Sequence, residues 1–288
     1  VLLGCLKAIM SGCTGCIGLT IYAATSINIS NNTFDGFTFS TVNQSNTYWK
    51  NTACRTCTRD IILDNNRILT GYWLPMQQEG QKIRVTNNFI YEDFVRSDTE
   101  STMFFTNKDF IFTNNTLVES KNKKSSNVNV TINANVVSGS SLETKEQINL
   151  FSPMKGDFKI RAQKVFFRES LDKREFSGLD VNTGNSIYIF VNTDPNGTLK
   201  KVIKFSDCHF NTEYRYLAPI YVEGASGRNS SQEFDIFFDH CEFTSQSDLS
   251  LLALGNNIVN DVIFNLHFNN YTFNVKSRAI CSDVNKFT

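Results

Sequence analysis

The sequence predicts an all-β chain built as a solenoid, in which short parallel strands stack repeat upon repeat around one core. Three observations predict this class: a short motif that recurs along the chain, alternating apolar and polar residues before its copies, and a composition rich in Asn and Phe but poor in Pro. β-branched and aromatic residues favour strands, and Asn favours tight corners. Helical bundles rarely have this composition.

The recurring motif consists of an apolar residue, a small polar residue, two Asn, any residue and a second apolar residue. Its clearest copies are ISNNTF at 29–34, LDNNRI at 63–68, VTNNFI at 85–90 and FTNNTL at 112–117. Weaker copies are INANVV at 132–137, IRAQKV at 160–165, FSDCHF at 205–210, FDHCEF at 238–243 and one around Asn269 and Asn270, with a missing copy expected near 186–192. A repeat of this length indicates stacked units that share one core.

The alternating segments before the copies place an apolar residue at every second position, as in Lys82-Ile-Arg-Val and Glu233-Phe-Asp-Ile-Phe-Phe. Such alternation is typical of strands that bury one face. When strands stack at a spacing of about 4.8 Å, the second Asn of each copy can hydrogen-bond to its neighbours above and below. The motif therefore predicts a ladder of Asn side chains at one corner.

The repeats predict one domain over residues 1–288. We expect a cap and first turn at 1–25, repeat coils at 26–275 and a cap or tail at 276–288. Because Leu2, Leu3, Leu6, Ile9 and Met10 fall at helical spacing, they predict a short N-terminal capping helix. Inserted loops are expected at 119–127, 138–146, 171–182 and 223–232.

The repeat pattern from Ser26 to Phe273 resembles the right-handed parallel β-helix superfamily of pectate lyases, polygalacturonases, phage tailspikes and polymorphic surface proteins. The resemblance implies a right-handed parallel β-helix of about 9–11 turns, closest in character to the surface proteins. It implies little about function, because this solenoid supports unrelated activities.

Charge and hydropathy exclude two classes of partner. The chain has 28 basic and 28 acidic residues, so it lacks the positive charge of proteins that bind phosphate backbones. No segment reaches the ~18 uninterrupted apolar residues of a membrane span. We therefore expect neither nucleic acid nor a membrane span.

Sequons and cysteines predict an extracellular or cell-surface protein. The cysteines allow disulfides, a four-thiolate zinc site at the two Cys-x-x-Cys pairs, or free thiols, and no metal or cofactor is our expectation. Cys208 and Cys241 share one column of the repeat, as a disulfide or as stacked thiols. The candidate glycosylation sites are Asn28, Asn31, Asn43, Asn114, Asn129, Asn196, Asn229 and Asn270. Asn31 and Asn114 lie in the repeat corner, so they are alternatively members of the corner ladder. The candidate disulfide residues are Cys13, Cys16, Cys54, Cys57, Cys208 and Cys241.

The resemblance also implies where catalytic groups would be sought. Asn192-Thr193-Asp194 matches one polygalacturonase motif, but the companion motifs that would supply a second carboxylate do not follow it. If the protein is an enzyme, its catalytic residues are expected among Asp207, Asp239, His240 and Glu242, close to His209, although no Arg or Lys interleaves with them. The sequence favours the other interpretation, in which these residues are solvated surface side chains.

Aromatic residues near predicted turns offer a route to binding, because they stack on sugar rings or anchor protein partners. They are Tyr48, Trp49, Tyr72, Trp73, Tyr214 and Tyr216. The sequence therefore favours a non-enzymatic surface protein that acts in adhesion or assembly through its lateral face and loops, with proteins, glycans or its own copies as partners. A polysaccharide lyase or glycoside hydrolase acting on acidic glycans is the alternative, and a building block of a fibre or spike is a third class.

Overall fold

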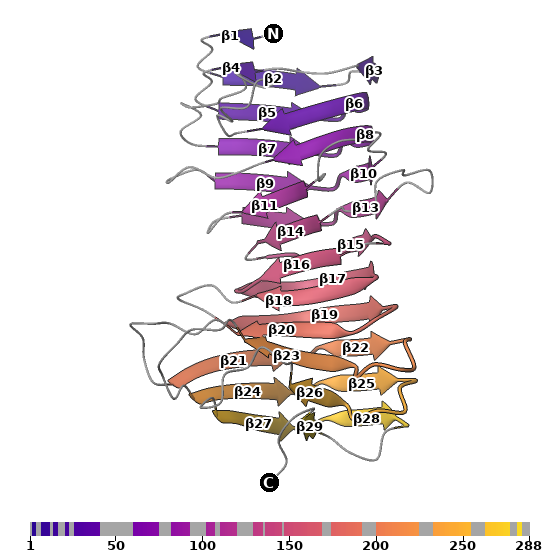
Figure 1. The fold of residues 1–288 in the computed structure, drawn as a ribbon. Coiled ribbons are helices and arrows are strands. Elements are labelled where there is room, and N and C mark those ends of the chain that lie inside the picture. Colours follow the sequence, from indigo (N-terminus) through magenta and orange to yellow (C-terminus); the bar gives the residue numbers. More distant parts are fainter. Residues whose placement is uncertain are drawn as a thin grey trace. The chain divides into compact units, whose positions relative to one another are not determined.

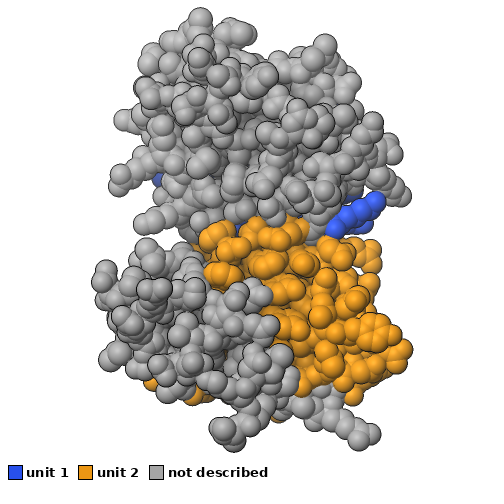
Figure 2. Space-filling model, in the orientation of Figure 1, with its two compact units in different colours: residues 1–146 blue, residues 147–288 orange. Residues whose placement is uncertain are grey.

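The structure is a computed structural model in which every secondary-structure element of the described residues is a β-strand (Figure 1). The chain divides into two compact units, residues 1–146 and 147–288, coloured separately in Figure 2. The described part of the chain contains no helix with the length and apolar character of a membrane span. The described residues are 2–3, 7–11, 14–16, 21–22, 26–40, 60–74, 82–92, 102–106, 110–119, 129–134, 136–145, 147–168, 174–191, 200–224, 233–254, 263–276 and 281–283.

Unit 1 consists of parallel strands. One series of parallel neighbours is β2-β5-β7-β9-β12, and a second is β3-β6-β8-β10-β13-β15. In addition, β1 pairs with β4, and β11 pairs with β14. The strands are β1 (Leu2–Leu3), β2 (Lys7–Ser11), β3 (Thr14–Cys16), β4 (Ile21–Tyr22), β5 (Ser26–Ser30), β6 (Thr33–Ser40), β7 (Asp60–Asp64), β8 (Arg67–Leu74), β9 (Lys82–Thr86), β10 (Phe89–Glu92), β11 (Thr102–Thr106), β12 (Phe110–Thr113), β13 (Thr116–Glu119), β14 (Asn129–Asn133) and β15 (Ser140–Glu143).

Unit 2 is also built from parallel neighbours. Its series are β16-β18-β20-β23-β26-β29, β17-β19-β21-β24-β27 and β22-β25-β28, and β22 also pairs with β19. The strands are β16 (Gln147–Phe151), β17 (Met154–Ala162), β18 (Lys164–Arg168), β19 (Glu175–Thr183), β20 (Ile187–Val191), β21 (Lys200–Ser206), β22 (His209–Thr212), β23 (Ile220–Gly224), β24 (Glu233–Asp239), β25 (Glu242–Ser245), β26 (Leu252–Leu254), β27 (Ile263–Asn269), β28 (Thr272–Val275) and β29 (Cys281–Asp283).

The parallel register stacks like residues into columns inside each unit. In unit 2 the rings of Phe176, Phe205, Phe238 and Phe268 lie on consecutive strands, with centroids 5.3, 5.2 and 5.1 Å apart and planes within 14° of parallel. Phe176, Phe205 and Phe238 are at most 2% exposed. Since burying one Phe side chain contributes about 1.5–3 kcal/mol, these columns stabilise the stack of strands.

In each repeat whose corner the structure describes, the corner that follows the inward-facing strand has one left-handed residue. Left-handed backbone is open to Gly and tolerated by Asn and Asp, which explains the first Asn of the motif. The non-glycine residues at this position have φ between 48° and 59°. The left-handed residues are Asn31, Asn65, Asn87, Asn114 and Gly139 in unit 1, and Gly156, Gly178, Asp207, His240 and Asn270 in unit 2.

The second Asn of the motif forms the predicted ladder in unit 1. Its members, all at most 3% exposed, are Asn32, Asn66, Asn88, Asn115 and Ser140. Asn88 Nδ2 donates to the carbonyl oxygens of Leu63 and Thr86, each at 2.9 Å, and Asn88 Oδ1 accepts from the backbone N–H of Asn66 at 2.9 Å. Because buried backbone groups need partners, each Asn satisfies the corner of its own repeat and that of its neighbour.

Three assignments of repeat copies are wrong. INANVV at 132–137 is not a corner copy, because β14 pairs with β11 rather than with a corner strand. IRAQKV at 160–165 spans the β17–β18 junction, and no copy lies at 186–192. The corners are instead at Gly139, Gly156 and Gly178, where Gly supplies the left-handed backbone and removes the Asn signature.

Two further expectations are wrong because strands occupy the segments. The described residues of 1–25 form β1 to β4 rather than a capping helix. Strand β15 lies in the loop expected at 138–146, and β19 covers most of that at 171–182. The loops expected at 119–127 and 223–232 lie largely outside the described residues, and the single-domain boundaries remain a prediction.

Candidate functional site

The predicted cluster of acidic and histidine residues is assembled at the corner of unit 2. His209 lies opposite Glu242 in the register of β22 and β25, and Asp207 and His240 both occupy the left-handed position, as their shared columns predicted. The left-handed corner directs these two side chains outward, where both are exposed. The cluster is therefore a surface feature.

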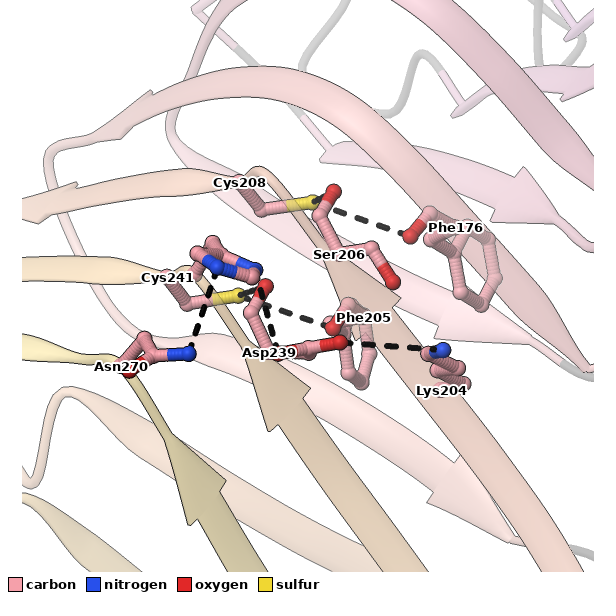
Figure 3. A network of polar contacts seen from close by, with 9 residues as sticks. Phe176, Lys204, Phe205, Ser206, Cys208, Asp239, Cys241 and Asn270 are labelled. Carbon is pink, nitrogen blue, oxygen red and sulfur yellow. Dashed lines mark hydrogen bonds and ion pairs between the residues drawn. The ribbon is translucent and has the colours of Figure 1, made fainter.

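The groups of this cluster pair with nearby side chains. His240 Nδ1 lies 3.1 Å from Asp239 Oδ1, and Lys204 Nζ lies 3.8 Å from Asp239 Oδ2 (Figure 3). The expectation that no Lys interleaves with the cluster is thus wrong. His209 Nδ1 lies 3.1 Å from an oxygen of Asp180. These side chains are 28–59% exposed, and pairs of such exposure contribute at most about 1 kcal/mol each.

Chemically, the cluster offers imidazole and carboxylate groups for proton exchange at the surface. Glu242 Oε1 accepts a hydrogen bond from Asn274 Nδ2 at 3.1 Å, and Asn270 Nδ2 lies 3.3 Å from His240 Nε2. In the described part of the chain, no three His, Cys, Asp or Glu side chains are arranged to hold a metal ion.

Cys208 and Cys241 replace the ladder Asn in unit 2 as free thiols, each 2% exposed (Figure 3). Cys208 Sγ donates to the carbonyl oxygens of Ser206 at 3.2 Å and Phe176 at 3.8 Å, the positions that Asn88 serves in unit 1. Hydrogen bonding with the Cys241 side chain and burial raise the pKa of the Cys208 thiol well above its usual value.

Register explains why these cysteines suit stacked thiols better than a disulfide. Parallel strands hold in-register residues about 4.8 Å apart, with their Cα–Cβ bonds pointing the same way. A disulfide needs Cβ atoms about 3.8 Å apart, so the strands would have to approach by roughly 1 Å. Of the two arrangements left open by the sequence, the structure contains the stacked thiols.

Sequence reasoning missed a second polar group, on the outer face of β24 and β27. The Asp235 side chain is only 8% exposed, and its Oδ1 lies 3.6 Å from His267 Nε2. Asn265 Nδ2 donates to Asp235 at 2.9 Å and to Glu233 at 2.6 Å, while the His267 ring stacks on Phe237 at 4.2 Å. Aligning the outward positions of Glu233–Asp239 with Ile263–Asn269 in the sequence would have found this group.

The clearest exposed aromatic feature is what we call the tyrosine platform, Tyr214, Tyr216 and Leu249. These side chains are 43%, 70% and 46% exposed, which confirms that the two predicted tyrosines lie at the surface. The tyrosine rings are 6.1 Å apart and meet at 78°. Two rings therefore meet almost at right angles, and the exposed Leu249 lies on the connection that is hydrogen-bonded to theirs.

The platform stands on two ordered connections, residues 213–219 between β22 and β23 and residues 246–251 between β25 and β26. Ser247 Oγ donates to the carbonyl oxygen of Leu217 at 2.7 Å, and the backbone N–H of Asp248 donates to the carbonyl oxygen of Arg215 at 3.3 Å. Arg215 Nε also donates to Asp248 Oδ2 at 2.8 Å. These bonds hold the two connections in register, so the backbone beneath the tyrosines is ordered before any ligand arrives.

The described sequons lie at two kinds of position. Asn31, Asn114 and Asn270 are exposed at the corner, and Asn28 and Asn129 lie in β5 and β14. Asn31 Oδ1 accepts from Asn65 Nδ2 at 2.7 Å, and Asn114 Nδ2 donates to Asn87 at 3.2 Å, so both belong to an outer ladder. Glycosylation at these sites remains a prediction.

Other predicted residues fall where side chains are not described. Cys16 lies in β3, and Tyr72 and Trp73 lie in β8. The residues outside the described ranges are Asn43, Tyr48, Trp49, Cys13, Cys54, Cys57, Asn196, Asn229 and the Asn192-Thr193-Asp194 motif. Comparison with protein-family models, with curated proteins and with solved structures finds no match to this chain.

Proposed function

We propose that this chain is a non-enzymatic extracellular or cell-surface protein with a right-handed parallel β-helix fold, and that it acts in adhesion or assembly through its lateral face and loops. Parallel pairing in both units and one left-handed corner in each repeat support the fold. The observation that carries the function is the tyrosine platform. Tyrosine is one of the side chains enriched at the sites that anchor binding partners, and the platform tyrosines lie on hydrogen-bonded connections.

Preorganisation makes the platform suited to binding. A flexible loop loses conformational freedom when it binds, at about 0.5–1.5 kcal/mol for each immobilised side chain. The stacked connections at Arg215–Asp248 and Leu217–Ser247 have already ordered the backbone beneath the tyrosines. A ligand that contacts Tyr214 and Tyr216 therefore has to order the tyrosine side chains but not the backbone beneath them.

The test is binding of the secreted, labelled full chain to intact cells of its source organism. We expect saturable binding that the double variant Tyr214→Ala/Tyr216→Ala weakens by roughly tenfold, since each ring supplies part of the apolar contact. Tyr271→Ala is the matched control, because Tyr271 is 46% exposed but lies outside the platform. Absence of binding, or equal binding by all three proteins, would refute the proposal.

A polysaccharide lyase or hydrolase acting on acidic glycans is the second candidate. The pairing of Lys204 with Asp239 next to His240 favours it, because such lyases use a basic side chain to remove a proton beside a uronate carboxylate. Incubation with polygalacturonate tests it, with chain cleavage as the readout. Cleavage that Lys204→Ala abolishes would establish the enzyme, and no cleavage would exclude this substrate.

A further inference from the structure

We propose that the tyrosine platform is a subsite for a neutral sugar residue. This inference rests on the proposed binding function and names its ligand class. The ring of Tyr216 is 70% exposed and that of Tyr214 is 43% exposed. An aromatic face carries partial negative charge, so it attracts the weakly positive C–H face of a pyranose ring. The 78° angle between the tyrosine rings lets one support the face of a sugar while the other borders its edge.

Charge at the platform favours a neutral sugar over an anionic one. The guanidinium of Arg215 is paired with Asp248 at 2.8 Å, so its charge is largely balanced. Glu213, which directly precedes Tyr214, is exposed and adds a negative charge. A uronate or sulfate group would be repelled by the Glu213 carboxylate, because like charges repel. Arg215 is already paired with Asp248, so it offers no free positive charge to offset this repulsion.

The polar rim of the platform fits hydroxyl groups. Glu213, Gln246 and Asp248 are exposed and carry planar groups with two polar atoms each. Such groups can bind neighbouring hydroxyls of one sugar ring, because a carboxylate accepts twice and a carboxamide both donates and accepts. The strand repeat brings residues 246–248 next to residues 213–215, so aromatic and polar groups share one small area.

The size of the platform favours a sugar over a folded protein. Among the residues that the structure describes, its apolar contact comes from Tyr214, Tyr216 and Leu249, all more than 40% exposed. A protein interface of standard size takes roughly 20–30 residues from each partner. A single sugar residue needs one or two aromatic faces and a few hydrogen bonds, which this platform supplies.

The test is affinity gel electrophoresis of the full chain through gels that contain neutral polysaccharides (mannan, galactan or starch) or anionic ones (polygalacturonate or dextran sulfate). We expect retardation by at least one neutral polysaccharide. The dissociation constant should rise roughly tenfold in Tyr214→Ala/Tyr216→Ala. It should stay within about twofold in Tyr214→Phe/Tyr216→Phe, which keeps the ring faces, and in Tyr271→Ala. Circular dichroism checks that the variants fold.

The outcomes separate this inference from the proposed function. Retardation by neutral polysaccharides that requires the tyrosine rings supports both. Retardation that the alanine variant retains overturns the sugar subsite, and so does retardation by anionic polysaccharides alone. Platform-dependent binding to cells without any retardation overturns the sugar subsite while the binding function stands, with a protein as ligand. Failure to bind either cells or polysaccharides overturns both.

Discussion

Replacement of Asn88 by Ala should destabilise unit 1 strongly, because this side chain serves two repeats. Asn88 Oδ1 is the acceptor for the backbone N–H of Asn66, which the substitution leaves buried without that partner, at about 1–3 kcal/mol. The bonds from Asn88 Nδ2 to the carbonyl oxygens of Leu63 and Thr86 are also lost, at about 1 kcal/mol each. These terms sum to about 3–5 kcal/mol, and because the site can partly relax we expect a loss at the lower end, about 3 kcal/mol.

Hydrogen exchange measures this loss locally, since stacked repeats need not unfold in one step. A local destabilisation of about 3 kcal/mol makes amide exchange roughly 100-fold faster in peptides that cover residues 60–70. Asn87→Gly is the matched control, because Asn87 is the exposed corner neighbour and Gly retains its left-handed backbone. The control should change exchange by less than threefold.

The comparison of these two variants decides the argument. If Asn88→Ala accelerates exchange no more than Asn87→Gly does, the buried amide ladder contributes little to stability. The second Asn of the motif would then have no energetic role in this fold. The same result would remove the physical reason for the recurring Asn pair.

Two further predictions concern unit 2. Gly178→Ala should lower the free energy of unfolding by about 2–4 kcal/mol in urea titrations, because φ is +70° and a Cβ would lie 2.7 Å from the carbonyl oxygen of Gly156. The control is Gly184→Ala, whose Cβ would meet only the side chain of Gln163, at 3.3 Å, and should cost less than about 1 kcal/mol. Equal costs for the two variants would contradict this reasoning. The raised pKa of Cys208 contributes stability that is fully present below the ordinary thiol value near 9.0 and is lost as the pH rises above it, because the unfolded chain releases its proton first. The hydrogen bond with Cys208 lowers the pKa of Cys241, which acts with the opposite sign and adds stability only as the pH rises toward 9.0. Between pH 9 and 10 the wild type should therefore lose up to about 1.4 kcal/mol more per pH unit than the double variant Cys208→Ser/Cys241→Ser, and parallel pH profiles would argue against this reasoning.

Much of the β architecture was predictable from the sequence. The alternation before each corner predicted strands, and the Asn pairs at 31–32, 65–66, 87–88 and 114–115 predicted both the corner and its ladder. The prediction succeeded because left-handed backbone and buried carbonyl groups each select for Asn. It failed at Gly139, Gly156 and Gly178, where Gly meets the backbone requirement without an Asn signature.

The candidate site was predictable only in part. The sequence identified Tyr214, Tyr216 and the columns of Asp207 and His209, because these follow from residue type and repeat register. It did not reveal the Asp235–His267 pair or the hydrogen bonds between the connections that carry Tyr216 and Leu249.

The sequence by itself determined that the chain forms β-strands, that Asn pairs form corners in unit 1, and which residues share a column of the repeat. These features depend on local backbone preferences and on the short motif that recurs along the chain. Only the tertiary structure decided which outward residues meet across repeats of unequal length. Asp235 and His267 are 32 residues apart in the chain but lie on adjacent strands, and the connections that carry Tyr216 and Leu249 meet through hydrogen bonds between residues about 30 positions apart. Contacts across repeats depend on register, and register is set by the strands and connections together rather than by any one segment.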